Sequence, residues 1–187
     1  FFEFNNLHHE HISYGTLNDS DGNPFKTRDG GTKPLSELFD ETYEYIKNIN
    51  SDLEDSTIKQ LANSVLTFSD LITNRKTDYK FDLEKFTNVN GKTGIYVQYA
   101  QVRAKKLQQS ISQQKNKMES IVLSDVDKQL LSQLFMFGYF LEQSSSLNEP
   151  HHLANYLYDI SNSFNQFYEH EKLSEIKDIN HLGSKLY

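Results

Sequence analysis

The sequence contains no cysteine, which excludes disulfides, thiolate metal sites and a cysteine nucleophile. No apolar run approaches the roughly 18 residues that a membrane-spanning helix needs. The Phe1-Phe2-Glu3-Phe4 start lacks the basic segment and cleavage site of a signal peptide. What is present, 187 residues with 36% hydrophobic and 24% charged content, suits a globular protein with one substantial core or two small ones. Together these features predict a cytoplasmic protein with no membrane partner.

Charge is distributed unevenly along the chain. The formal net charge is −7, which by itself argues against a nucleic-acid-binding protein. Residues 37–55 carry seven acidic side chains against one basic, whereas residues 92–118 carry six basic side chains and no acidic one. A basic helix on an acidic protein can guide a polyanion to one face. Lysine and arginine also simply solvate exposed helices, and charge alone favours that second interpretation.

Apolar periodicity predicts a mainly helical fold after an irregular N-terminal stretch. Residues 12–17 are typical of a short strand, and residues 18–22 of the turn that follows it. Pro34 is expected at a first helical position, where no amide hydrogen is needed. The predicted helices cover about 35–46, 58–72, 95–117, 125–144 and 151–172, with a single turn over 81–86. Ser124 is expected to cap the helix over 125–144.

Three clusters suggest metal sites, but each is explained as well or better without a metal. His8-His9-Glu10-His11 has no fixed carboxylate partner, and adjacent side chains point to different sides of a strand or helix. Asp19-Ser20-Asp21 begins like a calcium loop, but Pro24 takes the position that needs glycine. His151-His152 follows Pro150 where a helix begins, and helix entry explains the pair as well as ligation does. The sequence therefore predicts no metal site and no tightly bound cofactor.

The loop Phe25-Lys26-Thr27-Arg28-Asp29-Gly30-Gly31 carries the first group of residues with chemical potential. Two cations and a hydroxyl on a glycine-bearing loop can embrace phosphates and move when they are released. A basic loop in solvent has the same composition, so the loop alone does not decide between these interpretations.

A second group lies on the predicted helix 95–117. Tyr96, Tyr99 and Arg103 fall within an arc of about 60°, with Lys106 beside them. Aromatic faces stack on unpaired bases at roughly 1–3 kcal/mol per base, and neighbouring cations hold the nucleic-acid backbone. Packing against another helix is the alternative. For Tyr96, which borders apolar positions, packing and base binding are equally well supported. Tyr99 lies on the more polar side of the helix, which favours base binding.

Four blocks of the sequence occur in an order and at separations that resemble one family. They lie at 13–41, 68–82, 91–103 and 150–168, and include Asp21-Gly-Asn-Pro-Phe-Lys-Thr-Arg-Asp-Gly-Gly31 and Gly91-Lys-Thr-Gly-Ile-Tyr-Val-Gln-Tyr-Ala100-Gln-Val-Arg103. The family is arginyl-tRNA synthetase, of class I, and the resemblance extends over nearly the whole chain. It implies an arginine–tRNA ligase, which joins arginine to tRNA-Arg through an adenylate formed from ATP.

The resemblance also implies roles for individual residues. Lys26, Thr27 and Arg28 take the place of the flexible KMSKS-like loop (24–31), and Lys26 and Arg28 would be its catalytic cations on the ATP phosphates. The residues that would line the pocket for anticodon bases are Tyr96, Tyr99, Arg103, Phe164, Asn165 and Tyr168. Phe164 also belongs to an apolar stripe and so fits a core position. Asn165 can supply hydrogen bonds to base edges, although asparagine on a helix face is commonly just solvated.

The predicted fold class is mainly α. Residues 93–187 would form a helical-bundle anticodon-binding (DALR-type) domain without its last helix. Residues 1–92 would form the end of a class I catalytic domain, with a short β-hairpin or loop and connecting helices. The first residue is phenylalanine and the HIGH-like first signature is absent, so we expect a fragment that does not activate arginine alone. The expected partners are tRNA-Arg, arginine and Mg²⁺-bound ATP as a substrate, without DNA, in a monomeric protein.

Two other classes of protein are alternatives to the ligase. A free-standing RNA-binding module derived from the same fold would have no use for Lys26 and Arg28, so the intact loop favours the enzyme. A structural helical bundle without RNA does not explain why Tyr99 stands beside Arg103 in a helix that lacks acidic residues.

Overall fold

The computed structural model describes residues 10–18, 22–24, 34–111 and 123–170, and helices dominate them, as the sequence predicts. The helices are α1 (Leu35–Ile49), α2 (Asp55–Ile72), α3 (Leu83–Thr87), α4 (Gly94–Ile111), α5 (Asp125–Phe135), α6 (Phe137–Ser146) and α7 (His151–His170), and the strands are β1 (Leu17–Asn18) and β2 (Tyr79–Lys80). Within these ranges, every helix is too short or too polar to cross a membrane. Lys26, Thr27 and Arg28 lie outside the described residues.

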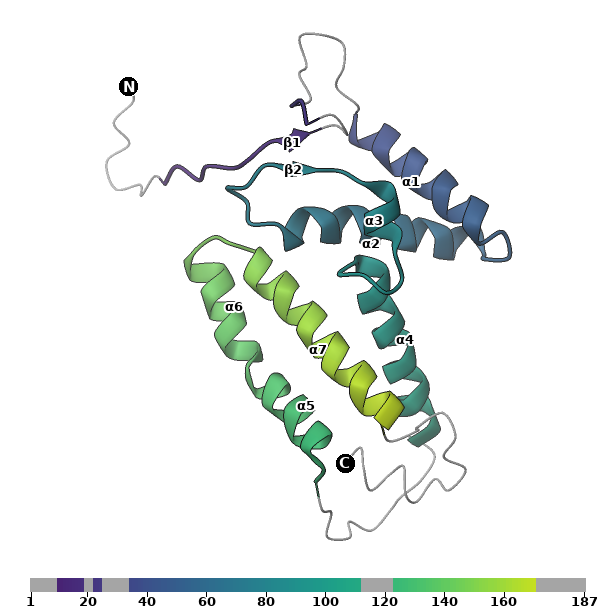
Figure 1. The fold of residues 1–187 in the computed structure, drawn as a ribbon, viewed down its shortest axis with the longest axis vertical. Helices are drawn as coiled ribbons and strands as arrows, with labels where there is room; N and C mark the ends of the chain where they lie inside the picture. Colours follow the sequence, from purple (N-terminus) through teal and green to yellow (C-terminus); the bar gives the residue numbers. More distant parts are fainter. Residues whose placement is uncertain (1–9, 19–21, 25–33, 112–122, 171–187) are drawn as a thin grey trace.

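Helix α2 links the two parts of the molecule. It packs against α1 and α3 on one side and against α4 and α7 on the other. Beyond it, α7 lies between α4 and the α5–α6 pair, and these helices form an elongated bundle (Figure 1). The order of helices therefore brings α4 and α7, which are far apart in sequence, into direct contact.

Each part has its own apolar cluster. The first is built on α1, α2 and α3 and contains the buried residues Ile46, Ile58, Ala62, Val65 and Phe86. The second lies between α4, α5 and α7, where Leu107 and Phe167 are buried and Val126, Leu130, Phe164 and Tyr168 pack against them. Two small clusters, rather than one large core, account for the fold, which is one of the two outcomes that the length allows.

The strand region differs from its prediction. The predicted strand over 12–17 is wrong in its boundaries, because only Leu17 and Asn18 are in a strand. An isolated antiparallel bridge joins Asn18 to Pro24. The main partner of β1, however, is β2, which lies parallel to it with Leu17 opposite Tyr79. A parallel pair needs a long crossover, so local turn residues gave no signal for it.

The helix starts agree with local chemistry. Ser124 caps α5: its hydroxyl accepts the Asp127 amide, and the Asp127 carboxylate accepts the Ser124 amide at 2.7 Å. Pro34 stands one residue before the first helical residue of α1 rather than inside the helix. At either position a backbone N–H would have no acceptor within the helix, so the N–H that proline lacks is not missed.

The helix predicted over 125–144 is divided at Met136 into α5 and α6. The Tyr156 hydroxyl of α7 donates a hydrogen bond of 3.1 Å to the Gln133 carbonyl, and the Met136 amide also bonds to that carbonyl. A side chain inserted into the ladder of helical hydrogen bonds is a common cause of a break. Gly138, a poor helix former, lies two residues after Met136. The prediction of one helix is wrong because Tyr156 is remote in sequence.

The crossing of α2 and α4 requires glycine at position 94. A Cβ atom built on Gly94 would overlap the carbonyl oxygen of Ser64 and lie 2.7 Å from the Ser64 carbonyl carbon. Backbone atoms of a packed helix cannot move aside cheaply. The absence of a side chain at Gly94 therefore sets the distance between the two helices.

We predict that Gly94→Ala lowers the free energy of unfolding by about 1–3 kcal/mol, because the two helices must separate. Urea unfolding followed by circular dichroism measures this change. Gly138→Ala is the matched control: a Cβ atom there meets nothing within 4 Å, and alanine in a helix should stabilise by about 0.5–1 kcal/mol. Equal effects of the two substitutions would contradict the close approach.

Candidate functional site

All six residues predicted for the pocket lie on α4 or α7, which pack against one another. Tyr96, Tyr99 and Arg103 come from α4, and Phe164, Asn165 and Tyr168 come from α7. Residues four apart on a helix lie on the same face, so Tyr99 and Arg103 are neighbours. The structure thus brings together residues that are more than 60 positions apart in the sequence.

Arg103 forms the centre of the site. Its guanidinium carbon lies 4.3 Å from the centroid of the Tyr99 ring and 4.5 Å from the centroid of the Tyr168 ring. Guanidinium groups are planar and are attracted to aromatic faces. Tyr99 is 49% exposed, whereas Tyr168 is partly buried against the Leu107–Phe167 cluster. The site therefore presents a cation held between two aromatic rings at the surface.

Two side chains of α7 bind the guanidinium of Arg103. Nη1 donates to Asn165 Oδ1 at 3.2 Å, and Nη2 lies 2.7 Å from Glu169 Oε1. Asn165 is only 8% exposed, so it is not the solvated surface residue that was the alternative for this position. Its Nδ2 atom is buried and has no hydrogen-bond partner in the structure. A buried amide donor of this kind favours a ligand with an acceptor atom.

Tyr96 lies beside this centre and is engaged with α7. Its ring contacts that of Tyr158 at 5.4 Å between centroids, and its hydroxyl donates to Asn162 Oδ1 at 3.2 Å. The ammonium of Lys92 lies 5.1 Å from the Tyr158 ring centroid. Tyr96 is thus half-buried against another helix, which is the packing arrangement considered for it, while its hydroxyl group remains at the polar face.

Phe164 points to the apolar side of the bundle. It packs against the buried pair Leu107 and Phe167, and its ring centroid lies 6.2 Å from that of Tyr168. This is the core position that its apolar stripe predicts. Its contact with Tyr168 supports the ring that stacks on Arg103.

Sequence reasoning missed three residues of this face: Tyr158, Asn162 and Glu169. With Asn165 they stand at positions i, i+4, i+7 and i+11 of α7, and such spacing puts them on one stripe of a helix. That polar stripe, opposite the apolar stripe of the same helix, is the signal that would have found them. The sequence does not show which side chain of α4 each of these α7 residues contacts.

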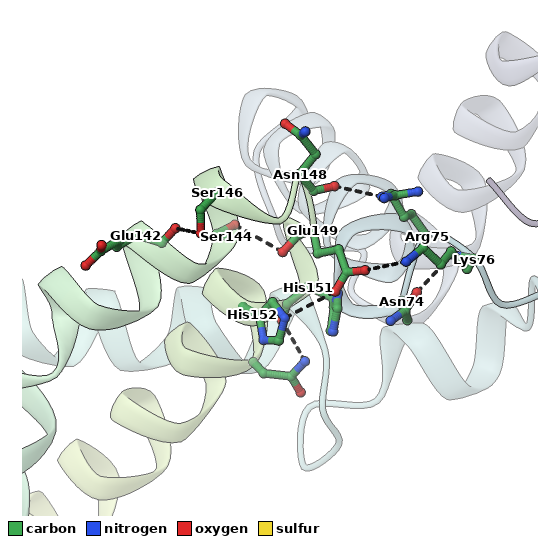
Figure 2. A network of polar contacts seen from close by, with 11 residues as sticks. Asn74, Arg75, Lys76, Glu142, Ser144, Ser146, Asn148, Glu149, His151 and His152 are labelled. Atoms are coloured by element: carbon green, nitrogen blue, oxygen red, sulfur yellow. Dashed lines mark hydrogen bonds and ion pairs between the residues drawn. The ribbon is translucent and has the colours of Figure 1, made fainter. Parts of the chain in front are cut away.

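A polar junction lies near the start of α7 (Figure 2). The Arg75 guanidinium donates to the Asn148 carbonyl at 2.8 Å and to the Ser13 carbonyl. The Lys76 ammonium lies 3.0 Å from Glu149 Oε1. Asn148 has a positive φ of 52°, which asparagine tolerates better than most residues. These contacts join the segment that leads into β1 to the loop between α6 and α7.

Glu149, His151 and His152 are close enough together to hold a metal ion, with one ligand atom of each within 4.8 Å of the others. The surroundings disfavour a cation, because Lys76 is ion-paired to Glu149 and the positive end of α7 begins at His151. The Lys76 hydrogen bond lowers the pKa of Glu149, and burial lowers the pKa of His151. Because Lys76 already neutralises the Glu149 carboxylate, we interpret the group as part of the ion-pair junction.

A cavity of about 1180 Å³ lies between α2, α4, α5 and α7. Most of its wall is apolar, with Phe68, Leu131, Leu157 and Phe167 among the lining residues. Such a wall offers little to bind a phosphate or a base edge. The stripe of α7 that faces Arg103, by contrast, carries amide and carboxylate groups that form hydrogen bonds or an ion pair with α4.

Two family models match successive parts of the chain. The model described as tRNA synthetases class I (R), catalytic domain, matches residues 2–83, and the model described as DALR anticodon binding domain matches residues 97–186. The second match contains most of α4 and all of α7, and with them five of the six predicted pocket residues; Tyr96 lies one position before it. Between them the two models account for nearly all of the sequence.

The curated relatives that match the chain are arginine–tRNA ligases. The arginine–tRNA ligase of Francisella tularensis subsp. novicida (strain U112) is 36% identical over 178 residues, which is 90% of this chain and 31% of the relative. Over nearly its whole length, the chain is similar to one continuous part of arginyl-tRNA synthetases. Another synthetase of the family, from Stutzerimonas stutzeri (strain A1501), is 34% identical over 171 residues. The chain spans about a third of the length of these arginyl-tRNA synthetases.

Solved arginyl-tRNA synthetases have the same fold. The Thermus thermophilus enzyme matches with a TM-score of 0.77 at 22% identity, over 94% of this chain and 31% of that one. The Plasmodium falciparum enzyme matches with a TM-score of 0.62 at 24% identity, over 81% of this chain and 29% of that one.

We predict that the Lys76–Glu149 pair stabilises the fold at neutral pH and not in acid. A carboxyl with a lowered folded pKa contributes stability above its ordinary pKa, and that stability is lost as pH falls through the folded value. Lys76→Met should therefore unfold at lower urea than the wild type at pH 7, and the difference should shrink at about pH 3. Lys105→Met removes an exposed cation of α4 as a control. A difference that stays constant with pH would contradict this role of the pair.

Proposed function

We propose that this chain is the tRNA-docking part of an arginine–tRNA ligase, which joins arginine to tRNA-Arg with ATP. The observation that carries the proposal is the surface cluster of Tyr99, Arg103 and Tyr168 inside the region similar to an anticodon-binding domain. The curated relatives of this chain are arginine–tRNA ligases, and the chain spans about a third of their length. The activity of the whole enzyme is therefore part of the proposal.

In this proposal, the two parts of the chain have different roles. Residues 93–187 would dock the anticodon loop, and residues 1–92 would belong to the catalytic region. The matched ranges of the two family models support a boundary near α4. Residues 1–92 would also carry the loop 24–31, which comes after β1 in the sequence. In this scheme, helix α2 and the polar junction hold the two parts together.

For the loop we propose contacts with ATP, the substrate, in its Mg²⁺ complex. Lys26 and Arg28 would neutralise the phosphates as pyrophosphate leaves, and Thr27 would add a hydroxyl donor. The 187 residues contain no HIGH-like first signature, so this chain alone would not form the adenylate. That chemistry would need the rest of the catalytic domain.

At the anticodon, the proposed mode of binding is stacking on rings combined with hydrogen bonds to base edges. Unpaired bases splayed from a loop can stack on aromatic side chains. Tyr99 offers an exposed ring, Arg103 offers a cation, and Asn165 offers an amide. Tyr96 would add its hydroxyl group, and Phe164 would support the ring of Tyr168 from the core side.

A free-standing RNA-binding module without catalysis is the alternative. The similarity of residues 2–83 to a class I catalytic domain favours the ligase, because a binding module would not need that region. We further propose a monomer located in the cytoplasm, without a DNA partner. The absence of cysteine fits a reducing compartment.

We predict that Tyr99→Ala weakens binding of tRNA-Arg by about 1–3 kcal/mol, the contribution of one stacked base. Fluorescence anisotropy with labelled tRNA at fixed salt measures the dissociation constant. Tyr139→Ala removes a tyrosine of similar exposure on α6 and should leave binding unchanged. Unchanged binding of the Tyr99 variant would remove the ring from the site. A large loss of thermal stability would mean that Tyr99 is structural instead.

A further inference from the structure

The guanidinium of Arg103 occupies the place where an RNA base could stack on the rings of both Tyr99 and Tyr168. It lies 4.3 Å from the Tyr99 centroid and 4.5 Å from the Tyr168 centroid. A nucleobase is planar, like a guanidinium group, and stacks on the same kind of aromatic face. In the structure, Arg103 thus covers the surfaces of the two rings that an RNA base would need.

Glu169 holds the guanidinium in that place from the solvent side. Its Oε1 atom lies 2.7 Å from Nη2 of Arg103, and its side chain is 65% exposed, whereas that of Arg103 is 19% exposed. Asn165 accepts from Nη1 at 3.2 Å on the buried side, one helical turn before Glu169. Arg103 is therefore fixed by one buried amide and one exposed carboxylate.

We propose that Glu169 gates the entry of RNA into this site, an inference that rests on the proposed function. Its carboxylate occupies the acceptor position on Arg103 that an RNA oxygen would take. Phosphate and carboxylate groups bind the fork of a guanidinium in the same way, so one can replace the other. RNA binding thus requires the Arg103–Glu169 pair to open, and Arg103 is then free to leave the space between Tyr99 and Tyr168.

The balance of interactions makes such an exchange feasible. A partly exposed ion pair contributes little, because water and salt screen it. When Arg103 moves, Oδ1 of Asn165 loses its donor, and the buried Nδ2 of Asn165 already has no partner. An incoming base edge with a donor and an acceptor would satisfy both atoms. The carboxylate of Glu169 also repels the phosphates of an approaching RNA, which adds to the barrier.

Removing the charge of Glu169 tests the gate in this chain. Glu169→Gln should bind tRNA-Arg about threefold to fivefold more tightly than the wild type at fixed salt near 0.15 M. Asp159→Asn is the matched control, because it removes one exposed negative charge from the same helix and lies ten residues away. Its effect should stay below about twofold. Circular dichroism melts establish that both variants fold.

A double-mutant cycle tests whether Glu169 acts through Arg103. In an Arg103→Gln background, which should bind RNA more weakly, the gain from Glu169→Gln should disappear. An equal gain in that background would show direct repulsion of RNA and overturn the gate. So would a Glu169→Gln effect no larger than that of Asp159→Asn, or weaker binding. If the wild type binds tRNA and Glu169→Gln changes nothing, the gate alone fails. If no variant binds tRNA, the proposed function fails with it.

Discussion

The contact between Leu107 of α4 and Phe167 of α7 holds the two helices at the distance on which the rest of the candidate site depends. Both side chains are almost fully buried, and Phe164 and Tyr168 pack against them. Because α4 and α7 are fixed there, Arg103 reaches Tyr168, Asn165 and Glu169 on the neighbouring polar stripe. The small apolar cluster thus fixes the positions of polar side chains that come from two different helices.

Helix α2 and the junction around Arg75 carry this arrangement to the other part of the chain. Gly94 lets α4 approach the backbone of α2, and Arg75 binds carbonyl groups on both Ser13 and Asn148. The segment that precedes β1 is therefore hydrogen-bonded to the loop from which α7 starts. In the proposed ligase, the same connections would fix the anticodon-binding helices relative to the end of the catalytic region.

Helices were the most predictable part of the fold, because their long apolar stripes and caps are local signals. The sequence predicts α1, α2 and the start of α5 for this reason. It also predicts that Tyr99 and Arg103 lie on one face of the same helix. It did not predict the break at Met136 or the parallel pairing of β1 with β2, since Tyr156 and Tyr79 act from distant positions. Glu169 escaped notice because its partner, Arg103, lies 66 residues earlier.

We propose that the face formed by α4 and α7 reads unpaired bases and not only phosphates. The most direct test is a titration of this chain with tRNA-Arg and with the same tRNA carrying an altered anticodon, at one fixed moderate salt concentration, because phosphate contacts vary steeply with salt. We predict tighter binding to the tRNA with the native anticodon. Equal affinity for the two tRNAs would contradict it, since contacts with the backbone alone do not distinguish sequence.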